Sequence, residues 1–192
     1  MSSNTYNIAY LQACLAEMEN YLLSSTLYGQ LHTKAPAGEP PFASLTLGNV
    51  LLARQELRSR SLDENLSMLF QDLESRLDMM RSQWFVAWEE KIKREYPARL
   101  RQWGFFLDEF RRRPEKYADR YPYEVRQRVI VELLGIEVQQ AAEDNREKLL
   151  ALDEALRKDF VEGEFVWDEE MKDGFPKEVY WYLWGRVEVK TP

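Results

Sequence analysis

The sequence predicts an all-α fold: six to seven helices around one long central helix, residues 62–95, with an aromatic C-terminal segment packed across it. Three observations lead to this prediction. Apolar residues recur at spacings of three and four along most of the chain, which is the period of an amphipathic helix. Residues 62–95 keep that spacing without a glycine or proline. Residues 164–189 hold three tryptophans, two phenylalanines and two tyrosines, and so much ring surface requires cover.

Length and composition favour a single helical domain over residues 1–192. Of the 192 residues, 45% are hydrophobic and 31% are charged, and a chain of this length can bury a core without disulfides. Its one cysteine, Cys14, cannot form an intramolecular disulfide. The first residues lack the pattern of a signal peptide, and no apolar run reaches the roughly 18 residues of a membrane span. We therefore expect a cytoplasmic protein with no membrane partner.

The N-terminal half of the chain predicts two helices, a loop and then the central helix. The helices cover residues 5–23 and 46–60, the second capped by Thr46. The loop covers residues 32–44, where three prolines and a glycine exclude a helix. Ser61 begins a Ser-x-x-Glu capping box in front of the central helix. The apolar face of that helix consists of Leu62, Leu66, Leu69, Phe70, Leu73, Leu77, Met80, Trp84 and Trp88.

Three further helices follow from apolar spacing in the C-terminal half, over residues 97–113, 123–134 and 137–160. Pro97 suits the first position of the first of them, because a proline there loses no helical hydrogen bond. Gly135 is the expected end of the second, since glycine readily takes the backbone conformation that closes a helix.

In the C-terminal aromatic segment, residues 164–192, the helical spacing of apolar residues stops, and residues 176–189 allow two interpretations. The run VYWYLWGRVEV is rich in β-branched and aromatic residues, which favours a strand. Pro176, in the position of a helical first turn, favours a helix from residue 176 to Trp184 that ends at Gly185. We predict the helix, with an extended piece after it, and keep the strand as the alternative.

The chemistry that the sequence can support is narrow. It has one histidine, His32, and one cysteine, Cys14, so it cannot supply the ligands of a His/Cys zinc site. We predict that His32 is a surface residue and that Cys14 lies on the apolar face of the first helix, packed in the core. The glycine-rich motifs of nucleotide-binding loops and the Gly-x-Ser-x-Gly motif of hydrolases are missing from the sequence. We therefore predict no catalytic residue, no cofactor and no metal ligand.

Pairs of acidic residues leave one enzymatic alternative, a magnesium-dependent all-α hydrolase. Two carboxylates three or four positions apart on a helix can share one Mg²⁺ ion. The pairs with this spacing are Asp144/Glu147, Asp159/Glu162 and Glu170/Asp173. We favour a solvated acidic face as the explanation of these pairs, because the Glu-x-x-Glu motif of all-α pyrophosphohydrolases is missing from the sequence.

Charge is distributed in two neighbouring blocks of opposite sign. Residues 91–128 hold twelve basic residues against six acidic ones, and residues 132–175 hold fourteen acidic residues against five basic ones. Such blocks can attract each other within the fold or steer a partner. The basic block, including Arg99 and Arg101, also makes a nucleic-acid-binding accessory protein an alternative function.

The function predicted first is non-enzymatic: an assembly or regulatory subunit that binds another protein or itself, as in a homodimer. Tryptophan and arginine are enriched at the energetic centres of protein interfaces. The candidate interface residues are Trp84, Trp88, Trp181, Trp184, Arg111, Arg112 and Arg113.

Overall fold

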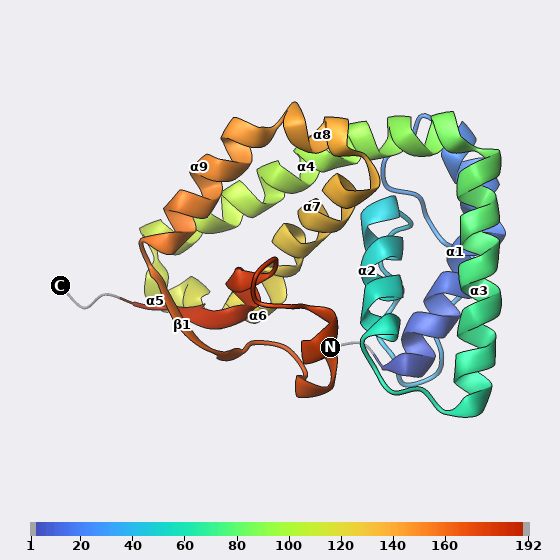
Figure 1. Ribbon diagram of the computed structural model, residues 1–192, viewed down its shortest axis with the longest axis horizontal. Coiled ribbons are helices and arrows are strands. Elements are labelled where there is room, and N and C mark those ends of the chain that lie inside the picture. The colour runs from blue at the N-terminus through green and yellow to red at the C-terminus, as the bar shows by residue number, and fades with distance from the viewer. Residues whose placement is uncertain (1–2, 190–192) are drawn as a thin grey trace. The chain divides into compact units, whose positions relative to one another are not determined.

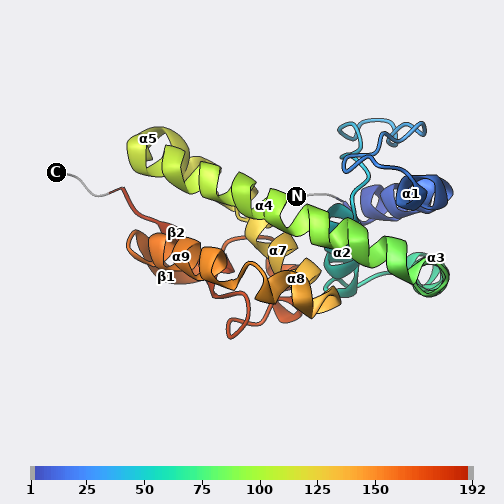
Figure 2. The same cartoon turned by 90° about the horizontal axis from the view of Figure 1, so that it is seen from above.

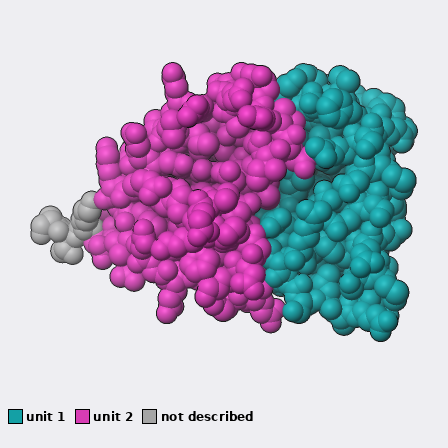
Figure 3. Space-filling view, viewed as in Figure 1, with its two compact units in different colours: residues 1–95 teal, residues 96–192 magenta. Residues whose placement is uncertain are grey.

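Helices make up most of residues 3–189, which are the residues that the computed structural model describes (Figure 1). The predicted all-α class is thus confirmed, with one short two-stranded ribbon near the C-terminus. The chain divides into two units, residues 1–95 and residues 96–192 (Figure 3). The single domain over residues 1–192 stays a prediction, and the two units are described in turn.

Unit 1 contains α1 (Asn4–Leu23), α2 (Leu47–Arg58), α3 (Glu64–Gln83) and the beginning of α4 (Phe85–Arg112). The first three helices lie side by side (Figure 1). Thr46 caps α2 as predicted, since its hydroxyl accepts a hydrogen bond from the Asn49 amide at 3.1 Å. The prediction of a capping box at Ser61 is wrong. Asp63 caps α3 instead, since its carboxylate accepts a hydrogen bond from the Leu66 amide at 2.9 Å.

The predicted central helix over residues 62–95 is two helices that meet at a corner. Trp84 leaves the helical conformation with φ −111° and ψ 33°, and α4 then continues through Pro97 to Arg112. Figure 2 shows α3 almost end-on, whereas the beginning of α4 is seen along its length. Residues 81–87 contain no glycine or proline, so the cause of the corner lies in tertiary contacts rather than in backbone preference.

The contacts that hold this corner are two buried charges near the beginning of α4. The Lys91 ammonium donates to the Ser24 carbonyl at 3.0 Å and to the Thr26 carbonyl, beyond the last turn of α1. The Glu95 carboxylate accepts from the Gly48 amide, in the first turn of α2, at 3.0 Å. Free carbonyls end a helix and free amides begin one, so each charge satisfies groups that the helix leaves unpaired. Burial lowers the pKa of Lys91.

The predicted loop is confirmed and is closed at its base. Gly29 and Leu45 exchange two backbone hydrogen bonds of 2.9 Å, so the loop begins and ends at one place. It is fastened to α1 by the Tyr10 hydroxyl, which donates to the Ser44 carbonyl at 3.0 Å, and by Phe42, whose ring meets Tyr6 edge-on.

Unit 2 begins within α4 and continues through short helices to the C-terminal ribbon. These helices are α5 (Pro114–Tyr117), η1 (Ala118–Arg120), α6 (Tyr121–Glu124), α7 (Arg126–Glu137), α8 (Gln139–Glu143) and α9 (Arg146–Arg157). Gly135 does not end its helix as predicted. A β-carbon at Gly135 would lie 3.2 Å from that of Ala142, so the glycine permits close packing of α7 against α8. The predicted helix over residues 137–160 is interrupted at Asn145.

The predicted helix over residues 176–184 is wrong: this segment is a turn followed by a short 3₁₀ helix, and the alternative strand holds only from Trp184 to Val187. The tail consists of β1 (Phe160–Phe165), η2 (Glu169–Gly174), η3 (Trp181–Leu183) and β2 (Trp184–Val187). The two strands pair antiparallel, with Phe160 opposite Val187 and Glu162 opposite Gly185. The predicted first turn at Pro176 is a turn of the chain, and the strand that follows it is set by pairing with residues far back in the sequence.

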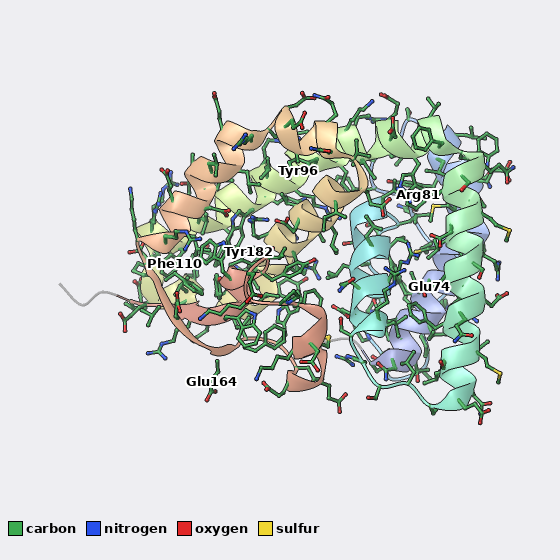
Figure 4. The ribbon with its side chains drawn as sticks, in the orientation of Figure 1. Glu74, Arg81, Tyr96, Phe110, Glu164 and Tyr182 are labelled. Atoms are coloured by element: carbon green, nitrogen blue, oxygen red, sulfur yellow. The ribbon has the colours of Figure 1, made fainter. Side chains whose placement is uncertain are left out.

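Aromatic side chains form the core of unit 2, and the tail supplies many of them. Trp103 of α4 packs on Tyr121, whose hydroxyl donates to the Tyr182 carbonyl at 2.5 Å. Tyr182 is fully buried and lies in the middle of the unit (Figure 4). The Trp167 indole donates to the Pro122 carbonyl at 2.7 Å. The predicted aromatic cluster of the C-terminal region is therefore confirmed, and within unit 2 its rings cover one another.

This core predicts alkaline unfolding of unit 2. Burial raises the pKa of Tyr96 and of Tyr180 to about 12 and raises the pKa values of Tyr121 and Tyr182 well above that of an ordinary tyrosine. Unfolded tyrosine loses its proton near pH 10. Above that pH the folded chain binds more protons than the unfolded chain, so stability should fall as the pH rises from about 10 towards 12. A phenolate absorbance titration should show these tyrosines ionising together with unfolding; gradual ionisation of a folded chain near pH 10 would contradict the expectation.

Candidate interaction surface

The predicted tryptophans lie in two different units and differ in exposure. In unit 1, Trp84 is half-buried at the corner and Trp88 is only 3% exposed, so Trp88 is a core residue. In unit 2, Trp181 is half-buried beneath the Arg157 guanidinium, 3.7 Å from its ring centre. Trp184 is also half-buried, and its indole donates to the Phe175 carbonyl at 3.0 Å. The interface role of the three half-buried rings stays a prediction.

Of the three predicted arginines, Arg111 and Arg112 end α4 and Arg113 follows it; all three are exposed. Arg112 and Arg113 lie 3.4 Å and 3.6 Å from the two oxygens of Glu109, so part of their charge is already balanced. Arg99, which the nucleic-acid alternative includes, is 3% exposed and donates to the Gln127 side chain at 3.0 Å. A buried guanidinium cannot reach a phosphate, which weakens that alternative.

The residues considered for metal or nucleophilic chemistry are spread through the fold. Within residues 3–189, no three His, Cys, Asp or Glu side chains lie close enough together to hold a metal ion. The Glu162 carboxylate accepts a hydrogen bond from the Lys177 ammonium at 2.8 Å. Burial of Cys14 raises the pKa of its thiol to about 12, which suppresses the reactive thiolate. The His32 side chain is 82% exposed and contacts Glu17, in agreement with the predicted surface position.

A cavity of about 500 Å³ lies under the loop of unit 1, between Gly29 and Ser44. Its lining mixes Leu31, Pro41 and Phe42 with Thr33 and Lys34. A site for a small molecule usually combines such an apolar lining with a few convergent polar groups. Glu39 also lines the cavity, but its carboxylate is already engaged: it accepts a hydrogen bond from the Ser3 hydroxyl at 2.6 Å.

The exposed outer face of α3 was not predicted from the sequence. We define it by the side chains that point away from the buried stripe: Asn65, Met68, Leu69, Asp72, Arg76, Met79 and Gln83. The buried stripe, Phe70, Leu73 and Leu77, packs inside unit 1. On the outer face Met68, Leu69 and Met79 are 58%, 44% and 62% exposed. A signal was present, because residues 68 and 79 are about three helical turns apart and so share one side.

Exposed apolar side chains continue after the corner. Phe85 is 52% exposed and Val86 is 72% exposed, and both belong to the first turn of α4. Single exposed apolar residues are ordinary, whereas a group of them in one region of the surface can mark an interaction site. Unit 1 therefore carries five large apolar side chains, on α3 and just beyond it, that its own helices leave in solvent.

Comparisons of the chain with protein-family models, with curated proteins and with solved structures find no match. Among the helices of residues 3–189, none is both long and apolar enough to cross a membrane.

Proposed function

We propose that this chain is a non-enzymatic assembly or regulatory subunit, and that the outer face of α3, with Phe85 and Val86, is its protein-binding surface. The observation that carries the proposal is the exposure of Met68 and Met79 on the side of α3 opposite its buried stripe, and of Leu69 at the edge of that stripe. Methionine suits such a surface because its flexible, polarisable side chain adapts to a partner.

The expected strength of the contact follows from the exposed apolar area. Burying the exposed half of a large apolar side chain contributes on the order of 1 kcal/mol, so five of them contribute about 5 kcal/mol from this chain. Association costs roughly 4–15 kcal/mol in lost freedom of movement. Even when the partner contributes as much again, the balance favours a reversible complex over a permanent one.

Site-specific photo-cross-linking in the cells that make the protein tests the proposal. The photoreactive residue p-benzoylphenylalanine is placed at Met68, at Met79 or, as a control, at Glu19, an exposed polar position of α1 in the same unit. We expect discrete adducts at Met68 and Met79 and none at Glu19. Absence of adducts at both methionines, or equal adducts at all three positions, would contradict the proposal.

A further inference from the structure

We infer that the partner is a second copy of this chain, with the outer faces of two α3 helices packed antiparallel about a two-fold axis that passes the outer face at the level of residue 74. The inference rests on the proposed function, because it names the partner of that surface. A two-fold axis makes one surface meet itself, so the surface must be its own complement. The outer face of α3 has this property.

Complementarity appears when each position i is matched with position 148 − i of the second copy. Asp72 then faces Arg76, an acid against a base. Leu69 lies opposite Met79, so apolar residues meet apolar residues. Asn65 faces Gln83, and two amides can exchange hydrogen bonds.

The charges on this face are available for such pairing. Asp72 and Arg76 contact each other at 3.5 Å within one helix, and their side chains remain 65% and 48% exposed. An exposed pair of this kind contributes little to the folded monomer. In the antiparallel arrangement the same two residues form two ion pairs between the copies. Both charges therefore have a complement on the same surface, which favours a second copy over an unrelated partner.

Two other charges of α3 form ion pairs with arginines of α2. Glu74 lies on the side of α3 that faces α2 (Figure 4), and its carboxylate accepts from Arg54 at 2.9 Å and from Arg58 at 2.6 Å. Asp78 accepts from Arg54 at 3.0 Å. The serines of α3 at positions 75 and 82 donate to carbonyls of their own helix, at 3.0 Å and 2.9 Å. Pairing along the outer face therefore buries none of these hydroxyls without a partner.

Charge exchange on Asp72 and Arg76 tests the pairing, with the mass measured by sedimentation over a range of concentrations. The parent chain should associate towards twice its mass of 22.9 kDa. Asp72→Arg and Arg76→Asp should each weaken self-association about tenfold or more, because like charges then face each other. An equimolar mixture of the two variants should associate at least as well as the parent, since one copy then presents two bases and the other two acids. The double exchange should also restore association.

A matched control separates this effect from changes within one helix. Glu89 and Lys93 of α4 have the same spacing and order, at 3.8 Å, and Glu89→Arg places two bases together as Asp72→Arg does. We expect Glu89→Arg to leave self-association unchanged. A monomeric parent, or single variants that associate as well as the parent, would overturn the inference.

Cysteine cross-linking tests the direction of the helices. Cys14 is buried, so an introduced cysteine is the reactive thiol. Leu69→Cys and Met79→Cys chains should be joined by a short thiol-to-thiol reagent when mixed, because these positions face each other. Neither should join to itself, since equivalent positions lie about 15 Å apart along the axis. Self-linking of either variant alone would indicate parallel helices and overturn the arrangement.

The two proposals fail in different ways. Photo-adducts at Met79 to a different protein, with a monomeric parent chain, leave the proposed function standing and remove the second copy. Photo-adducts missing from both Met68 and Met79 remove the surface itself.

Discussion

Gly185→Ala is expected to disrupt the C-terminal ribbon and to lower the free energy of unfolding of unit 2 by about 3 kcal/mol or more. An alanine β-carbon at this position would lie 2.2 Å from the Val161 carbonyl oxygen and 2.7 Å from the Phe160 ring. The glycine also has φ +155°, which a residue with a side chain adopts only with strain. The clash is with backbone, so rotating a side chain cannot relieve it.

The opposing strand offers a matched control for this prediction. At Gly163 the nearest atom to a new β-carbon would be the Gly185 α-carbon, at 3.7 Å, which is an ordinary contact. Gly163→Ala should therefore change stability by less than about 1 kcal/mol. Urea unfolding followed by tryptophan fluorescence measures both variants, because Trp184 lies in the same ribbon. Equal, small effects of the two substitutions would show that the ribbon tolerates separation of its strands.

Arg128→Leu is expected to destabilise unit 2 by about 3–5 kcal/mol, because it leaves two largely shielded carboxylates without their buried partner. The Arg128 guanidinium donates to both oxygens of Asp153, at 2.9 Å and 3.0 Å, and to Glu132 at 2.9 Å. It also lies over the Tyr182 ring, 4.5 Å from the ring centre. Only 5% of its side chain is exposed, so solvent does not replace these bonds when they are lost.

Two comparisons in the same urea experiment sharpen this prediction. Arg120→Leu removes an exposed partner of Glu124, whose ion pair is 2.7 Å, and should cost less than about 1 kcal/mol. Replacing Arg128, Asp153 and Glu132 together by leucines removes the charges with their partners and should recover much of the loss. If Arg128→Leu cost no more than Arg120→Leu, the buried network would not be a main source of stability.

Local sequence patterns predicted the parts of the fold that depend on local interactions. The cap at Thr46 was predicted because one hydroxyl and one amide three residues apart suffice for it. The loop under α1 followed from its prolines, and the helical class followed from apolar spacing. In each case the deciding contacts lie within a few residues along the chain.

The features that were mispredicted depend on distant residues. The corner at Trp84 is held by Lys91 and Glu95, whose partners lie near residues 24 and 48. The strand β2 forms because Gly185 can approach β1, which the run of aromatic residues alone does not reveal. The same limit applies to the candidate surface. Apolar spacing assigned Leu69 to the inner face, because one stripe cannot show which of its edges the neighbouring helices leave uncovered.

Lys91 and Glu95 also select the direction in which their neighbours run. They lie one turn apart, and each meets the helix end whose partial charge is opposite to its own. If α1 or α2 were threaded in reverse, a cation would meet amide donors or an anion would meet carbonyls. Two residues thus disfavour alternative topologies, even those that would bury the same apolar side chains equally well. The electrostatic penalty is large because both charges are buried, where water does not screen them.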